Sequence, residues 1–85
     1  MAKILLRYMG RFCELAQKPL EEREVTCKTF SELIDLLEHD YPGYAAEFYN
    51  LIGERHECTL RRPEVASINP KADEPVRDGD CYGFY

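Results

Sequence analysis

The chain has 85 residues, of which 16 are acidic and 11 are lysine or arginine, so its formal net charge is -5. We expect a single domain spanning residues 1–85, which buries only about 60–65% of its unfolded surface. The 45% hydrophobic content favours an ordered globule over disorder. The acidic balance argues against nucleic acid as a partner, because phosphate binding needs a basic stripe. A basic protein surface is the better match, and solubility alone is the alternative.

The sequence carries no sign of a membrane or export segment. No run approaches the roughly 18 apolar residues of a membrane span, and the Met1 start leads into a strand-like run rather than a signal peptide. No Cys-x-x-Cys pair occurs, so neither a zinc knuckle nor a redox motif is indicated. We therefore expect a cytoplasmic protein with reduced thiols, and the sequence leaves the role of its four cysteines open. They are Cys13, Cys27, Cys58 and Cys81.

Two alternating segments at the start predict an opening hairpin with a broad loop. They span residues 3–9 and 20–27, and Gly10 and the Gln17-Lys18-Pro19 turn lie between them. In the first segment Ile4, Leu6 and Tyr8 share one face, while Leu5, Arg7 and Met9 share the other. The second segment carries charges suited to an edge strand, where they block unwanted strand pairing. These charges are Glu21, Glu22 and Glu24.

The clearest local signal is Thr29-Phe30-Ser31-Glu32, because threonine followed three residues later by glutamate is typical of a capping box. The apolar residues that follow predict an amphipathic helix that ends before Pro42. They are Phe30, Leu33, Ile34 and Leu37. A shorter helix is predicted over residues 44–51. Its apolar face would carry Tyr44, Phe48 and Leu51.

The second half is less regular. Residues 53–64 are polar and give only a weak signal, and residues 65–68 predict a short strand before an Asn69-Pro70 turn. Asp78-Gly79 predicts a tight turn into a last strand over residues 81–85. The order ββαββ is typical of an α+β fold in which the first and last strands lie side by side in parallel. The residues expected to face the helix are Ile4, Leu6, Tyr82 and Phe84.

Four short patterns, in the right order, resemble the MoaD/ThiS family of small ubiquitin-like sulfur carriers. Residues 11–16, RFCELA, are similar to the family's RELAG-type segment, with Cys13 where arginine is common and Gln17 where glycine is. Residues 29–33, TFSEL, look like the opening of its helix. Ile68-Asn69 resembles its VN, and residues 78–80 resemble its DGD. The resemblance implies a ubiquitin-like β-grasp fold, a mixed sheet with one main helix packed on one face.

The same resemblance raises the question of the C-terminus. Members of the family continue into a flexible tail ending in Gly-Gly, whose last carboxylate is adenylated and turned into a thiocarboxylate. Here the sequence ends at Tyr85 on a predicted strand, so we expect a non-catalytic binding protein without thiocarboxylate chemistry in this form. The alternative is a sulfur carrier for molybdopterin, thiamine or a related product, whose tail is missing from this sequence. A small enzyme has little support, because no nucleophile or His/carboxylate arrangement is readable, and no cofactor is indicated.

The candidate partner-binding site is the sheet face turned away from the helix. By alternation it carries Leu5, Met9, Gly83 and Tyr85. Met9 and Tyr85 match positions where MoaD-like members present apolar side chains to a partner enzyme. The expected partner is therefore another protein, such as an E1-like or cofactor-synthesis enzyme, and the alternatives are a homodimer or incidental exposure.

Other polar groups favour structural interpretations. His56, Glu57 and Cys58, with His39, supply only one local pair of ligands, so no metal site is expected. Cys81 is expected to be a half-buried strand cysteine. Arg61 and Arg62 are expected to form a solvated pair, and gripping a phosphate or a carboxylate is the alternative.

Overall fold

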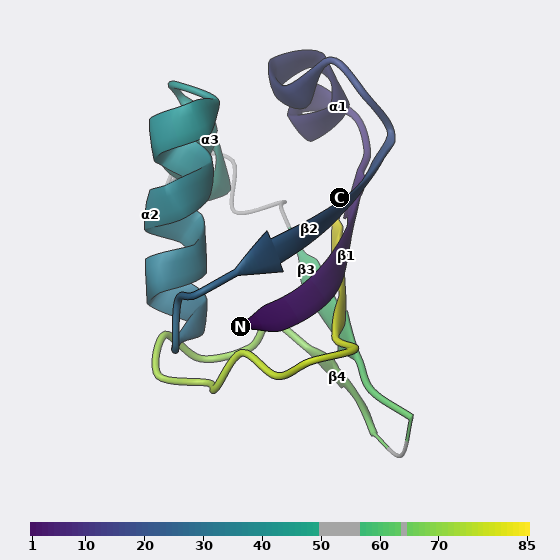
Figure 1. Cartoon of the computed structure of the whole chain (residues 1–85). Helices are drawn as coiled ribbons and strands as arrows, with labels where there is room; N and C mark the ends of the chain where they lie inside the picture. The colour runs from purple at the N-terminus through teal and green to yellow at the C-terminus, as the bar shows by residue number, and fades with distance from the viewer. Residues whose placement is uncertain (50–56, 64) are drawn as a thin grey trace.

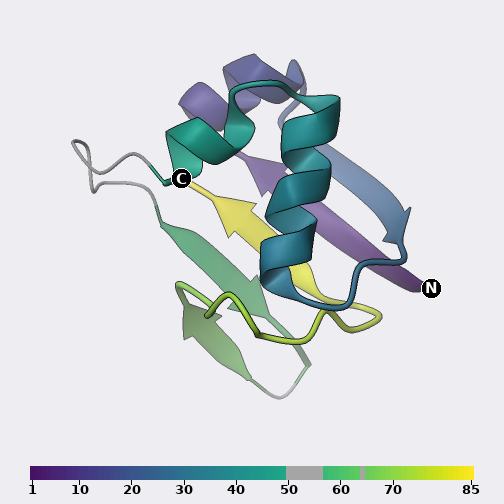
Figure 2. The same ribbon diagram turned by 90° about the vertical axis from the view of Figure 1, so that its left-hand side faces the viewer.

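A five-stranded mixed sheet forms the scaffold of the chain (Figures 1 and 2). The computed structural model describes residues 1–49, 57–63 and 65–85. The strands lie in the order β2-β1-β5-β3-β4; β1 and β5 are parallel, and the other neighbours are antiparallel. Their bounds are β1 Ala2–Tyr8, β2 Leu20–Val25, β3 Cys58–Arg61, β4 Ala66–Ile68 and β5 Cys81–Phe84.

The two central strands are the first and the last in sequence, as predicted. Leu6 pairs with Tyr82 and Tyr8 pairs with Phe84 across the parallel ladder. The four side chains expected to face the helix, Ile4, Leu6, Tyr82 and Phe84, are each no more than 1% exposed. The hydrophobic alternation of β1 and β5 therefore fixes which face of the sheet is covered.

Helix α2, Phe30–Asp40, covers that face (Figure 2). The capping box forms as predicted: the Glu32 amide donates to Thr29 Oγ1 at 3.3 Å, and the Glu32 carboxylate accepts from the Lys28 amide at 3.1 Å. The predicted stripe, Phe30, Leu33, Ile34 and Leu37, is buried. The helix ends at Asp40, two residues before Pro42.

Two short helices close one end of the core. Helix α1, Arg11–Ala16, lies where a broad loop was predicted, so that expectation was wrong. Its ends are set by left-handed residues, Gly10 with φ 58° and Gln17 with φ 59°, and Phe12 and Ala16 turn one buried face inward. Helix α3, Tyr44–Phe48, is shorter than predicted. Leu51, expected on its apolar face, lies outside the described residues.

Strand β3 was not predicted either. It occupies part of the segment judged weak and polar, and it makes the described sheet five-stranded where four strands were expected. Cys58 and Leu60 are buried on the helix side, while Thr59 and Arg61 point to the other face. With only two apolar residues in four, the strand depends on pairing with β5 for its identity.

A polar network seals the gap between the edge strand β2 and helix α2. Glu21 accepts hydrogen bonds from Tyr8 at 2.8 Å and Tyr41 at 2.9 Å, and Arg23 bridges Glu21 and Asp40. Burial alone would raise the pKa of Glu21, but the bonds from Tyr8, Tyr41 and Arg23 outweigh it and lower that pKa. Glu21 is therefore part of the core boundary rather than only a charge that guards the edge.

The described helices are short. None of those in residues 1–49, 57–63 and 65–85 is long and apolar enough to cross a membrane.

Candidate protein-binding face

The face of the sheet opposite α2 is left open by the described helices (Figure 1). We call this surface the open face. Strand register lines up its side chains in two main rows across the sheet. One row is Leu20, Arg7, Gly83, Thr59 and Ile68. The next is Glu22, Leu5, Cys81, Arg61 and Ala66.

The four residues predicted to form the partner site do lie on this face, with unequal exposure. Met9 is 37% exposed and Tyr85 is 41% exposed, and they follow β1 and β5 directly. The Met9 amide donates to the Phe84 carbonyl at 3.0 Å, which holds these two strand ends together. Leu5 is half-buried. Met9 and Tyr85 therefore offer apolar surface at the same end of the open face.

Gly83 provides space rather than contact surface. It is buried, and a Cβ there would lie 2.8 Å from Thr59 Oγ1 and 3.4 Å from the Tyr85 ring. Tyr85 thus lies over Gly83, and its position depends on the missing side chain.

Two exposed apolar residues of the open face were not predicted. Leu20 is 51% exposed and Ile68 is 65% exposed, at opposite ends of the row that contains Arg7 and Gly83. Alternation in the predicted strand 20–27 was a signal that could have found Leu20, because it shares a face with Glu22 and Glu24. The position of Ile68 on this face could not be predicted without β3, because β4 joins the sheet by pairing with β3.

The open face is hollowed beside its centre. A hollow of about 430 Å³ is lined by Leu5, Arg7, Pro19, Leu20 and Cys81. The backbone just before β2 is fixed there by the Tyr8 amide, which donates to the Pro19 carbonyl at 2.9 Å. The lining combines apolar side chains with one formal charge, that of Arg7.

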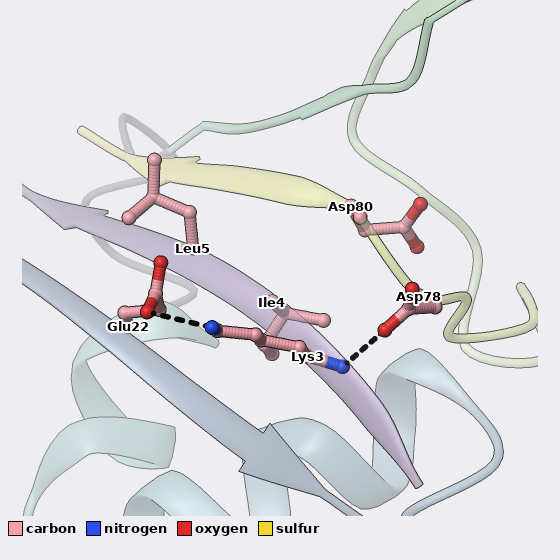
Figure 3. Close-up of a pocket in the computed structure, with 7 residues that line it drawn as sticks. Lys3, Ile4, Leu5, Glu22, Asp78 and Asp80 are labelled. Carbon is pink, nitrogen blue, oxygen red and sulfur yellow. Dashed lines mark hydrogen bonds and ion pairs between the residues drawn. The ribbon is translucent and has the colours of Figure 1, made fainter.

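A smaller hollow of about 280 Å³ lies where β1 begins, and Figure 3 shows Lys3 there in contact with Glu22 and Asp78. The Lys3 ammonium lies 3.2 Å from the Glu22 carboxylate, and the Lys3 amide donates to Asp78 at 2.8 Å (Figure 3). The Gly79 amide donates to the Lys3 carbonyl at 2.8 Å. These bonds attach the Asp78-Gly79 turn to β1, so the polar groups of this hollow have a structural role.

Arg61 and Arg62 do not form the solvated pair that was expected. Arg61 is exposed on the open face, whereas Arg62 turns inward and donates to Asp80 at 2.8 and 3.2 Å and to Glu74 at 3.1 Å. Asp80 is 1% exposed and also accepts from Tyr82 at 3.0 Å. The alternative of gripping a carboxylate is the correct one for Arg62, and the carboxylate belongs to the chain itself.

The cysteines are separate thiols. All four are free, and Cys81 is half-buried on its strand as expected. Burial raises the pKa of Cys58, which leaves that thiol protonated and unreactive. Among the described residues no group of three His, Cys, Asp or Glu side chains could hold a metal ion, and His56 lies outside them.

Comparison with known proteins identifies the class of fold. No protein-family model matches the sequence, and no curated protein matches it. Solved structures do match. SAMP1 from Haloferax volcanii superposes with a TM-score of 0.66 at 17% identity, covering 99% of this chain and 93% of that one.

A second structure gives the same result. A protein from Pyrococcus furiosus, named as molybdopterin converting factor subunit 1, superposes with a TM-score of 0.67 at 18% identity. The match covers 99% of this chain and 95% of that one. The chain therefore has the ubiquitin-like β-grasp fold, and its resemblance to the MoaD/ThiS family is confirmed at the level of the fold.

Proposed function

We propose that this chain is a non-catalytic, MoaD/ThiS-like protein that acts by binding another protein through its open face. The observation that carries the proposal is the gathering of exposed apolar side chains on the sheet face that no described helix covers. They are Met9, Leu20, Ile68 and Tyr85. Large apolar side chains exposed together on one uncovered sheet face mark an interaction site more often than residues scattered over the whole surface do. Tyrosine and methionine are also enriched in the cores of protein interfaces.

The expected partner is an E1-like or cofactor-synthesis enzyme, since both solved neighbours have the fold of this family and one is named as a molybdopterin converting factor subunit. A homodimer through the same face is the alternative partner. Four free thiols suit a reducing compartment, so we place the protein in the cytoplasm.

Site-specific crosslinking tests the proposal. A photoreactive amino acid is introduced at Met9 in one variant and at His39, exposed on α2, in a control variant. After irradiation in an extract of the source cells, we expect a defined crosslinked partner from position 9 and none from position 39. Crosslinks from position 39 alone would place the interface on the helical side.

The second candidate function is sulfur carriage, which the name of the Pyrococcus furiosus neighbour favours. In the family that this chain resembles, the terminal glycine carboxylate attacks ATP and forms an acyl-adenylate with release of pyrophosphate. A sulfide-level sulfur donor then displaces AMP to give the thiocarboxylate. The natural gene product is incubated with ATP and an E1-like enzyme of the source organism, and its intact mass is measured. A mass gain that corresponds to a thiocarboxylate would establish the carrier.

A further inference from the structure

Arg7 carries the only formal charge among the residues that line the larger hollow of the open face. The hollow, about 430 Å³, has apolar walls contributed by Leu5, Pro19 and Leu20 and the thiol-bearing Cys81. Register places Arg7 on the inner strand β1, next to the edge strand, between Leu20 of β2 and Gly83 of the central strand β5. A guanidinium beside an apolar hollow in a central strand is suited to a ligand that has both a carboxylate and an apolar group.

Arg7 is exposed and has no carboxylate partner among the described residues. Arg23 and Arg62, in contrast, are paired: Arg23 binds Glu21 and Asp40, and Arg62 binds Asp80 and Glu74. The chain has 16 acidic residues against 11 lysines and arginines, so the lack of a partner at Arg7 does not come from a shortage of carboxylates. Arg7 therefore keeps its hydrogen-bonding capacity available to a partner, on an inner strand of an otherwise acidic protein.

The other charges of the open face lie on both sides of Arg7. Arg61 lies across β5 from Arg7, roughly 12 Å away by strand geometry, and is also exposed without a carboxylate partner among the described residues. The carboxylates lie at the margins: Glu22 is on the edge strand and pairs with Lys3, and Glu24 is further along the same strand. The net charge of -5 is thus not the charge that a ligand meets in the middle of the sheet.

We propose that the open face recognises an acidic segment of a partner protein, in which an aspartate or glutamate pairs with Arg7 and a neighbouring aliphatic or aromatic side chain enters the hollow. This inference rests on the proposed function and adds the chemistry of the partner to it. It reverses the expectation from overall charge, which favoured a basic partner surface. A carboxylate matches the planar guanidinium with two parallel hydrogen bonds, so the pair also orients the segment across β1 and β5.

A random-sequence peptide library, displayed and selected on the immobilised folded protein, supplies the probe. Selected peptides are synthesised and located by amide chemical-shift mapping. Their affinity is then measured for the unmodified protein and for Arg7→Glu, Arg7→Met and Lys71→Glu. Lys71→Glu is the matched control, because it changes the net charge equally at an exposed loop position. Arg7→Met keeps an unbranched apolar stem without the charge, in case Arg7→Glu disturbs folding.

We expect peptides that shift the amides of Leu5, Leu20 and Cys81 to be enriched in carboxylates next to apolar residues. Arg7→Glu should weaken their binding on the order of tenfold at low salt, and Arg7→Met less. Lys71→Glu should have little effect. Raising the salt from about 0.05 to 0.5 M should reduce the difference, because exposed charges are screened. A peptide with lysine in place of its aspartate should bind Arg7→Glu better than it binds the unmodified protein.

Three results would overturn the inference: recovery of no peptide that maps to the hollow, binders without enriched carboxylates, or equal effects of Arg7→Glu and Lys71→Glu. Failure here is distinguishable from failure of the proposed function. If Met9→Asp abolishes partner binding while Arg7→Glu leaves it unchanged, the open face remains the partner site and only the acidic chemistry is wrong.

Discussion

Arg62 holds the carboxylate of Asp80 with two hydrogen bonds, one from Nε to Oδ1 at 2.8 Å and one from a terminal guanidinium nitrogen to Oδ2 at 3.2 Å. The same guanidinium donates to Glu74 and to the Pro75 carbonyl. Arg62 follows β3, and Asp80 precedes β5. The pair therefore fixes the long loop before the last strand against the end of β3, and through it the position of β5 in the centre of the sheet.

Removing the Arg62–Asp80 ion pair should lower the stability of the fold. Arg62→Met leaves Asp80, 1% exposed, as a buried carboxylate without its cation, and should lower the free energy of unfolding by roughly 3–5 kcal/mol. The control is Arg61→Met, one residue away but exposed, which should change it by no more than about 0.5 kcal/mol. Urea unfolding measures both. Equal stability of the two variants would show that the pair contributes nothing beyond a surface ion pair.

Buried tyrosines should make the fold labile to alkali. Burial raises the pKa of Tyr8, Tyr44 and Tyr82 above the ordinary value of about 10. The folded state thus binds these protons more tightly than the unfolded state. Their contribution is fully present below about pH 10 and is lost as the pH rises above it. Tyrosinate absorbance and circular dichroism, followed together, should show these tyrosines ionising only as the chain unfolds. Ionisation of all six tyrosines in the folded protein near pH 10 would contradict this.

Gly83→Ala should destabilise the protein through one contact. The added Cβ would lie 2.8 Å from Thr59 Oγ1, and overpacking of this kind costs roughly 1–3 kcal/mol. Thr59→Ala removes the clashing oxygen, so the double variant should recover about 1 kcal/mol or more relative to additive effects. Thermal or urea unfolding of the four proteins completes the cycle. Strict additivity would mean that Tyr85, rather than Thr59, limits the space.

Helix α2 should depend on its buried stripe and on its cap to different degrees. Leu33→Ala removes a fully buried side chain and should cost roughly 2–5 kcal/mol, whereas Thr29→Ala should cost about 1 kcal/mol through the lost cap. Asp35→Ala, at an exposed helix position, serves as the control. If urea unfolding places Leu33→Ala within about 0.5 kcal/mol of the unmodified chain, the range of surface changes, the helix does not pack as described.

The parts of the fold that were predictable carry their signal locally. The capping box at Thr29, the stripe from Phe30 to Leu37 and the alternation of β1 and β5 each depend on residues within one element. The spacing of apolar residues along each element shows which of its faces is buried, without knowledge of the elements that pack against it. The sheet face opposite α2 was therefore also predictable. Met9 and Tyr85 were placed on that face correctly for this reason.

The parts that were missed depend on contacts distant in sequence. Helix α1 has only six residues, and Phe12 packs against Tyr44, with ring centroids 5.0 Å apart, from another helix. Strand β3 is specified by its pairing with β5. Arg62 looked like a solvated residue because its partner, Asp80, is 18 positions away. The burial of Gly83 likewise follows from Thr59 and Tyr85 rather than from its own strand.

Charge insertion at Met9 and Tyr85 tests whether the open face binds a partner protein. Partner binding is quantified by affinity capture from source-cell extract, and by light scattering for self-association, with Met9→Asp, Tyr85→Asp and the helix-side control His39→Asp. Interface anchors of this kind often contribute 2 kcal/mol or more, so both open-face variants should lose on the order of thirtyfold in affinity. Their melting temperatures should stay near that of the control. If both variants fold and bind the partner as well as His39→Asp does, the open face is not the partner site.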